Sequence, residues 1–150
     1  MRFVFDTNVL IDGLADDFNA QTRLIEAVCD GEIEAVATPQ TEREYRRIIG
    51  RFSLDPKASR RLQNFLDSVT QVEPSQAQSD IVIDDAEDKK FIWAAIGGQA
   101  DAIVTNDHHL LDLGEVGTIR MLKPTEAWAD VEQNTGTAWQ DFIRGLGISR

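Results

Sequence analysis

The feature that most constrains the fold is an alternation of short apolar runs with segments of helical periodicity along the 150 residues. The apolar runs predict strands at residues 3–5, 34–38, 102–105 and 118–122, with a possible short strand around Val72. Helices are predicted at residues 18–30, after Pro39, at 55–69, up to Ile96, after Pro124, and around Trp139, Phe142 and Ile143. Strands that alternate with helices predict a single α/β domain with a mostly parallel sheet.

Capping residues indicate where several of these helices begin. Thr38 precedes Pro39 and Asp55 precedes Pro56, so each helix has an N-cap residue and a proline in its first turn. The helix that ends at Ile96 is expected to begin at Asp84 or Asp85. The helix after Pro39 is expected to bury Tyr45, Ile48, Ile49 and Phe52.

Composition narrows the class of protein. The chain has 15 basic and 26 acidic residues, so its formal net charge is −11. No apolar run approaches the roughly 20 residues of a membrane helix, and the three apolar residues before Asp6 are too few for a signal sequence. The only cysteine, Cys29, excludes an internal disulfide framework. We therefore expect a cytoplasmic protein with no membrane contact, and the net acidity by itself disfavours a nucleic-acid partner.

The charge is distributed unevenly, which weakens the argument from net acidity against a nucleic-acid partner. Residues 43–61 contain seven basic and two acidic residues, a net charge of +5, whereas the rest of the chain carries −16. This basic stretch is either a solvated helical face or a patch that binds phosphates. Its basic residues are Arg43, Arg46, Arg47, Arg51, Lys57, Arg60 and Arg61.

Two carboxylates follow predicted strands. Asp6 comes directly after residues 3–5, and Asp107 comes shortly after residues 102–105. Ligands of open parallel α/β sheets bind at the carboxyl ends of the strands. The two acids are therefore candidate site residues, although each alone could be a turn or helix-cap residue.

Further acids lie on predicted helices. Asp88 shares a face with the apolar stripe that includes Phe91 and Ile92, and an inward carboxylate is costly unless it is paired or binds a metal. Glu42 and Glu44 lie on the helix after Pro39, and periodicity does not choose between them. Either could instead be a surface charge that pairs with a nearby arginine.

Carboxylates that converge would repel one another unless a cation neutralised them. Mg²⁺ and Mn²⁺ suit a set of oxygen ligands, and such an ion can activate water and stabilise charge on a phosphodiester. No group of residues has zinc-site spacing. His108 and His109 are adjacent and would diverge on a regular element, so we do not expect either to bind the metal.

Taken in order, these segments resemble the PIN-domain ribonucleases, a family that includes the VapC-like toxins of bacterial toxin–antitoxin pairs. The resemblance extends over about residues 2–130, leaving a C-terminal helical extension at 134–150 beyond a domain at 1–133. It rests on an opening strand before Asp6-Thr7-Asn8-Val9-Leu10, on Glu44-Tyr45 with Ile48-Ile49 and Arg51, on Asp88-Lys89-Lys90-Phe91, and on residues 100–107 with Leu110-Leu111.

The resemblance implies a PIN-like fold, with a parallel sheet flanked by helices on both faces and an acidic pocket that binds Mg²⁺ or Mn²⁺ and cleaves RNA. The implied catalytic and metal-binding acids are Asp6, Glu44, Asp88 and Asp107, which favours Glu44 over Glu42. Asn8 and Thr105 match positions that support the pocket by hydrogen bonds. His108-His109 depart from the family pattern, in which Lys or another polar residue often follows the last acid.

The resulting hypothesis is metal-dependent hydrolysis of RNA, with Arg43, Arg46, Arg47 and Arg51 as candidate contacts to the RNA backbone. The partners implied by the resemblance are RNA and an antitoxin that could insert a basic side chain into the pocket. The apolar face of the extension could pack on the domain or on a second copy in a homodimer. The main alternative is a catalytically silent binding module. A phosphate-handling α/β protein is disfavoured because the first strand lacks an Asp-x-Asp motif.

Overall fold

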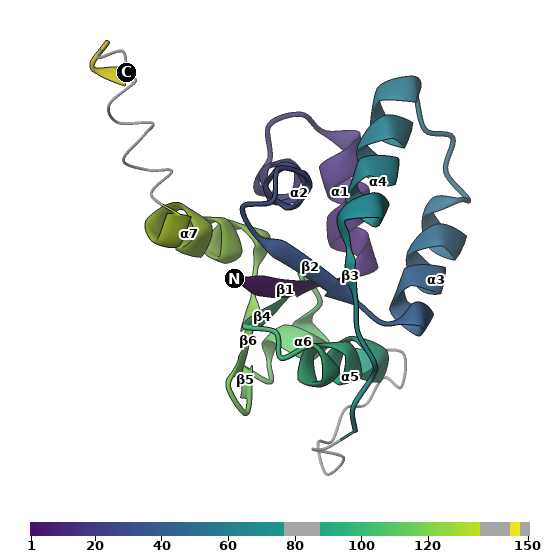
Figure 1. The fold of residues 1–150 in the computed structure, drawn as a ribbon, viewed down its shortest axis with the longest axis vertical. Coiled ribbons are helices and arrows are strands. Elements are labelled where there is room, and N and C mark those ends of the chain that lie inside the picture. Colours follow the sequence, from purple (N-terminus) through teal and green to yellow (C-terminus); the bar gives the residue numbers. More distant parts are fainter. Residues whose placement is uncertain (77–87, 136–144, 148–150) are drawn as a thin grey trace.

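A six-stranded sheet forms the centre of the computed structural model, which describes residues 1–76, 88–135 and 145–147 (Figure 1). Its strand order is β3-β2-β1-β4-β6-β5. All neighbouring strands are parallel except β5 and β6. The strands are β1 (Arg2–Phe5), β2 (Glu34–Ala37), β3 (Thr70–Gln71), β4 (Ala102–Val104), β5 (Glu115–Val116) and β6 (Ile119–Leu122).

The two central strands are buried on both faces. Phe3, Val4 and Phe5 of β1 have no exposed surface, and the residues of β4 are equally buried. Continuous apolar runs of this kind are typical of parallel strands covered on both faces. Phe5 pairs with Val104 in the register of β1 and β4, so the two strands end at the same edge of the sheet.

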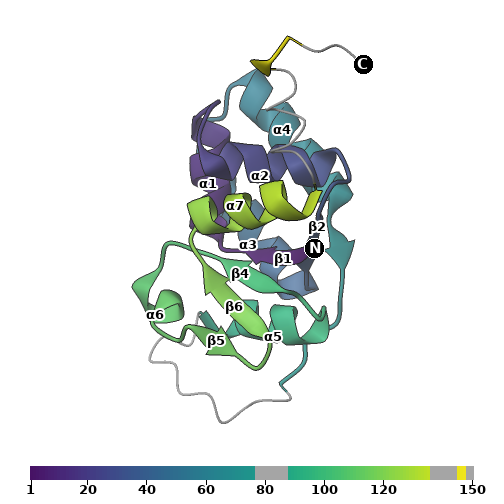
Figure 2. The same cartoon turned by 90° about the vertical axis from the view of Figure 1, so that its left-hand side faces the viewer.

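Helices cover both faces of this sheet. In Figure 1, α1, α2 and α4 lie on one side and α5 lies on the other. The helix α3 leads away from the carboxyl end of β2, and Figure 2 shows α7 running alongside α2. The helices are α1 (Thr7–Ala15), α2 (Ala20–Cys29), α3 (Pro39–Ile49), α4 (Pro56–Ser68), α5 (Lys89–Gly97), α6 (His108–Leu111) and α7 (Pro124–Thr135).

Most of the predicted elements are confirmed, and three short ones were not predicted. The mostly parallel α/β sheet with helices on both faces is present, as are the predicted N-caps Thr38 and Asp55. The sequence analysis did not predict α1, α6 or β5. Val72 lies just beyond the short strand β3, although its backbone N–H still bonds to the carbonyl of Ala37 at 3.0 Å.

The prediction that Phe52 is buried is wrong. Its side chain is 52% exposed because α3 ends at Ile49 with Gly50 as its C-cap, which places Phe52 beyond the helical stripe. Ile48 is half-buried, whereas Tyr45 and Ile49 are buried as predicted.

Two predictions fall outside the described residues. These are the start of a helix at Asp84 or Asp85 and the last helix with Trp139, Phe142 and Ile143. Within the described part of the chain, no helix combines the length and apolarity that crossing a membrane would require.

Candidate active site

Asp6 and Asp107 are joined through a single threonine hydroxyl. Because β1 and β4 are neighbouring parallel strands, Asp6 and Thr105 leave the sheet side by side. The hydroxyl of Thr105, which is fully buried, donates to Asp6 Oδ2 at 2.8 Å and accepts the backbone N–H of Asp107 at 2.9 Å. The pairing of the two strands therefore fixes both carboxylates at one edge of the sheet, as the spacing of the sequence predicts.

The electrostatic environment of Asp6 disfavours its charge. The residue is only 7% exposed, and burial is the main cause that raises the pKa of its carboxyl group. Hydrogen bonds from Thr105 and from the backbone of Asn8 oppose this shift, whereas the charges of Asp107 and Glu44 add to it. A site that raises the pKa of a carboxyl group in this way favours a cation beside it.

Glu44 reaches the same edge from α3. Thr38 and Thr41 form a capping box at the start of this helix, with backbone-to-hydroxyl bonds of 2.9 and 3.2 Å. The buried hydroxyl of Tyr45 donates to the carbonyl of Phe5, which ties α3 to the end of β1. These contacts fix the rotation of α3 and hence the direction in which Glu44 points.

The contacts of Glu42 and Glu44 differ, which resolves the ambiguity left by periodicity. Glu44 accepts a hydrogen bond from the Thr7 hydroxyl at 2.7 Å and forms an ion pair with Lys90 of α5. Glu42 instead pairs with Arg46 at 3.1 Å and accepts a bond from Gln71. Glu44 therefore lies with the candidate site residues, close enough for its charge to act on Asp6, whereas Glu42 contacts none of them.

Thr7 and Lys90 also belong to the candidate site through their contacts with Glu44, and no sequence pattern singled them out. Both are buried, at 5% and 6% exposure. The only signal for Lys90 was its position next to the apolar stripe of the helix, where a lysine needs a partner. Asn8 contributes its backbone N–H, at 3.4 Å from Asp6 Oδ1, while its side chain is exposed.

Asp88, Asp107 and His109 form the third part of the site. Each offers one ligand atom, and these atoms lie within 4.8 Å of one another; among the described residues, no other such group is present. Asp88 is only 6% exposed at the start of α5, so its predicted inward direction is confirmed. The Nδ1 atom of His109 lies 3.2 Å from Asp107 Oδ1, so this histidine lies beside the acids, whereas His108 belongs to no such group among the described residues.

Three of the four candidate arginines lie on α3, and they do not share one face of it. Arg47 follows Glu44 by three positions, so it lies on the side of the helix that carries Glu44, and Arg43 precedes Arg47 by four positions, so it lies beside Arg47. Within the described part of the chain, neither forms a side-chain hydrogen bond or an ion pair. Arg46 faces away and is paired with Glu42. Arg51 lies in the turn beyond the helix and is exposed.

Two of the three basic residues of α4, Lys57 and Arg61, are engaged within the fold. Lys57 and Arg61 contact Asp17 at 3.0 and 3.1 Å and lower the pKa of its carboxyl group, chiefly by hydrogen bonds. These two basic residues therefore help to hold α4 against the segment between α1 and α2. The phosphate-binding interpretation is left with the arginines of α3, with Arg51 in the turn that follows it, and with Arg60 of α4, which is exposed and has no ion pair among the described residues.

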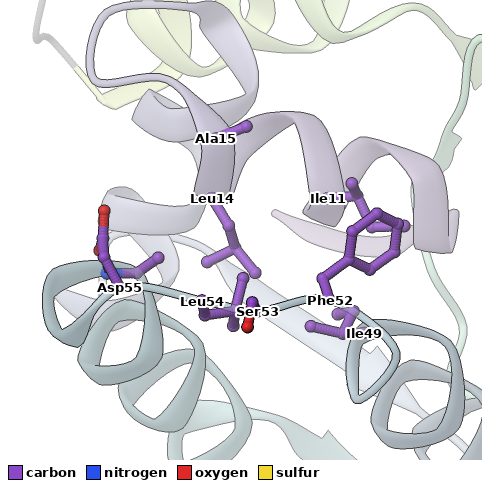
Figure 3. Close-up of a pocket in the computed structure, with 9 residues that line it drawn as sticks. Ile11, Leu14, Ala15, Ile49, Phe52, Ser53, Leu54 and Asp55 are labelled. Carbon is purple, nitrogen blue, oxygen red and sulfur yellow. The ribbon is translucent and has the colours of Figure 1, made fainter.

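A separate apolar hollow of about 290 Å³ lies between α1, α3 and the start of α4 (Figure 3). The ring of the exposed Phe52 lies beside Ile11 in this hollow, and Leu14, Ile49 and Leu54 also line it. Its only acid, Asp55, caps α4 by accepting from the backbone of Ala58 at 2.8 Å. The hollow contains none of the candidate site residues.

The fold and these contacts can be compared with known proteins. A family model described as PIN domain matches residues 2–109, so the chain belongs to the PIN-domain family. PIN domains are usually nucleases that use divalent metals, and the acidic cluster fits such a site.

The comparison with solved structures gives the same fold. The crystal structure of VapBC2 from Rickettsia felis bound to a DNA fragment from their promoter is similar with a TM-score of 0.56. The match covers 82% of this chain and 98% of that chain at 13% sequence identity. This similarity confirms the predicted PIN-like fold. No curated protein matches the chain in sequence.

The residues present fit a divalent cation. Carboxylate oxygens and an imidazole nitrogen are ligands for ions such as Mn²⁺, and the three ligand atoms of Asp88, Asp107 and His109 are near enough to share one ion. Asp6 lies next to this group through Thr105, and its burial adds to the need for a nearby positive charge.

Proposed function

We propose that the protein is a divalent-metal-dependent endoribonuclease that hydrolyses RNA phosphodiester bonds. Its catalytic and metal-binding residues would be Asp6, Glu44, Asp88 and Asp107, with Mg²⁺ or Mn²⁺ as the ion. The observation that carries this proposal is that carboxylates from four separate segments gather at the carboxyl edge of one sheet. Their mutual repulsion is costly unless a bound cation neutralises their charge.

The residues of the chain would divide the work between them. Asp88 and Asp107 would bind the ion directly, and Asp6 would add its charge from a position fixed by Thr105. Glu44, fixed by Thr7 and Lys90, would stand at the opposite side of the site and orient water. When bound, the ion supplies positive charge that polarises the phosphate and activates the attacking water.

The arginines of α3 would hold the RNA backbone beside these acids. Arg43 and Arg47 flank Glu44 and have no acidic partner among the described residues, and Arg51 is exposed close by. Guanidinium groups bind phosphate oxygens well because their donors match the phosphate geometry. Arg46 is a weaker candidate because Glu42 already pairs with it.

We further propose that the protein is the toxin of a toxin–antitoxin pair, with an antitoxin protein as its partner. The support is membership of the PIN-domain family and the structural similarity to VapBC2. Expression of the chain alone should arrest growth, and the Asp6→Asn variant should not. Relief of the arrest by a small neighbouring gene would identify the antitoxin, whereas normal growth on expression would contradict this part of the proposal.

The experiment that tests the nuclease activity is a cleavage assay on total RNA with mapped cut sites. We expect cleavage with Mn²⁺ or Mg²⁺, none with EDTA, and none by Asp6→Asn or Asp88→Asn. Asp12→Asn is the matched control because Asp12 is an exposed carboxylate of α1 outside the site. Cleavage that resists EDTA, or that both site variants retain, would refute the proposal.

The alternative of a catalytically silent module is favoured by one observation. Lys90 already neutralises Glu44, so part of the acidic charge is compensated by the protein itself. Under this alternative the protein would bind Mn²⁺ yet cleave no RNA in the same assay.

A further inference from the structure

His109 is placed beside the acids by the same turn that places Asp107. Asp107 is the N-cap of α6, and its Oδ1 atom accepts the backbone N–H of His109 at 2.9 Å. The same oxygen lies 3.2 Å from His109 Nδ1. The carboxylate therefore holds both the backbone and the ring of His109, and a ring nitrogen lies within 4.8 Å of the ligand atoms of Asp88 and Asp107.

The geometry points to His109 as a nitrogen ligand of the divalent ion, completing a donor set with Asp88 and Asp107. This inference rests on the proposed function, because it concerns the ion of that same site. The ligand atoms of the three residues lie within 4.8 Å of one another, a separation that one ion can bridge. Their exposure increases from the buried Asp88 to the exposed His109, so His109 stands at the solvent side of the site.

An imidazole ligand has a consequence for the choice of metal. Mg²⁺ prefers oxygen ligands and keeps much of its water, whereas transition-metal ions accept imidazole nitrogen readily. A site built from two carboxylates and one histidine should therefore favour Mn²⁺ over Mg²⁺. The metal preference of this protein would be set by His109, a residue at which the chain departs from the family pattern.

A purely structural explanation of the contact is a surface ion pair between His109 and Asp107. The side chains are 60% and 30% exposed, and such pairs contribute little to stability. This explanation predicts that Mn²⁺ has no nitrogen ligand. His108 is the matched control. It is exposed like His109, but adjacent helical residues do not face each other. Among the described residues, His108 belongs to no metal-ligand group.

The direct test is electron spin-echo spectroscopy of Mn²⁺ bound to the full chain, which detects a nitrogen nucleus in contact with the ion. We expect a ¹⁴N signal in the wild type and in His108→Gln, and its loss in His109→Gln. A wild-type complex that contains Mn²⁺ but lacks the ¹⁴N signal would overturn the inference. This measurement on the wild type does not depend on how well any variant folds.

Calorimetric titration with Mn²⁺ and Mg²⁺ supplies the second readout. Substitution of a residue that contacts a metal ligand, without binding the metal itself, typically lowers metal affinity about 10–100-fold. Loss of His109 as a direct ligand should therefore weaken Mn²⁺ binding at least tenfold. Mg²⁺ binding should change much less, and His108→Gln should change neither. Equal affinities of the wild type and His109→Gln for Mn²⁺ would overturn the inference.

The two proposals fail in different ways. If the wild type cleaves RNA with Mn²⁺ but shows no nitrogen ligand, the role of His109 is refuted and the nuclease proposal stands. If the wild type shows the nitrogen ligand but cleaves no RNA, the nuclease proposal is refuted and the metal site stands. If the wild type binds no divalent ion, both are refuted.

Discussion

Two parts of the site hold their acids in different ways. We call Asp6 and Glu44 the inner pair, and Asp88, Asp107 and His109 the outer trio. Each carboxylate of the inner pair accepts a hydrogen bond from a threonine hydroxyl: Asp6 from Thr105 at 2.8 Å and Glu44 from Thr7 at 2.7 Å. Lys90 also neutralises the charge of Glu44. In the outer trio, ligand atoms converge within 4.8 Å.

This difference separates the stability of the site from its affinity for an ion. Donors of the protein contact both carboxylates of the inner pair, so changes there should alter the free energy of unfolding as well as activity. The outer trio gathers charge where an ion can share it, so changes there should alter metal affinity most. Each prediction below tests this division.

The largest effect is expected for activity. Asp88→Asn and Asp6→Asn should each lower the rate of RNA cleavage by about 10³-fold or more, because the ion contributes several kcal/mol of charge stabilisation. Asp88→Asn should also lower the affinity for Mn²⁺ by tenfold or more in calorimetry, and Asp6→Asn should lower it by less. Equal losses of Mn²⁺ affinity in the two variants would remove the distinction between inner pair and outer trio.

The next effect concerns stability. Lys90→Met should lower the free energy of unfolding by about 3–5 kcal/mol, because it leaves the partly buried carboxylate of Glu44 without its cation. Denaturant unfolding measures this change. Lys89→Met is the control on the same helix, and the double variant Glu44→Gln/Lys90→Met should recover much of the loss. If Lys90→Met is as stable as the wild type, Lys90 does not compensate the charge of Glu44.

A smaller effect follows from the raised pKa of Asp6. Burial disfavours the charged form of Asp6 in the folded protein, so its pKa is higher in the folded chain than in the unfolded chain. The protonated carboxyl group therefore contributes its full stability below the usual pKa of 3.8. This contribution is lost as the pH rises through the higher pKa of the folded protein. In EDTA, Asp6→Asn should therefore gain stability relative to the wild type as the pH rises from 4 to 8. Asp12→Asn should show no such trend, and a parallel pH dependence of Asp6→Asn and the wild type would contradict the account.

The smallest effect concerns the surface beside the inner pair. Arg47→Ala should weaken RNA binding and reduce the slope of log affinity against log salt by about 0.7, the value for one phosphate contact on a single strand. Arg46→Ala is the control, because Arg46 faces away from Glu44 and pairs with Glu42. Equal changes in slope for the two variants would show that the position of an arginine on α3 does not determine whether it contacts the RNA phosphates.

Much of the sheet and part of the site could be predicted from local patterns. The apolar runs predicted the central strands, and their ends located Asp6 and Asp107. The apolar stripe that begins at Phe91 identified the inward direction of Asp88. These are properties of single elements, and periodicity and burial determine them.

The remaining features depend on contacts between elements. Periodicity left Glu42 and Glu44 equivalent, and the choice arises from Thr7 of α1 and Lys90 of α5. His109 was not expected beside the acids because the four-residue helix α6 has no sequence signal long enough to predict its orientation. Phe52 was misplaced because the helix ends one turn earlier than the apolar pattern suggests.

The most direct test of the central claim is the position of the ion in a crystal of the wild-type protein grown with Mn²⁺. Anomalous diffraction at the manganese absorption edge locates Mn²⁺ without any assumption about activity. We predict a single strong peak at the carboxyl edge of the sheet, in contact with Asp88 and Asp107 and beside Asp6. A peak elsewhere on the surface, or no peak in crystals that contain saturating Mn²⁺, would contradict the account.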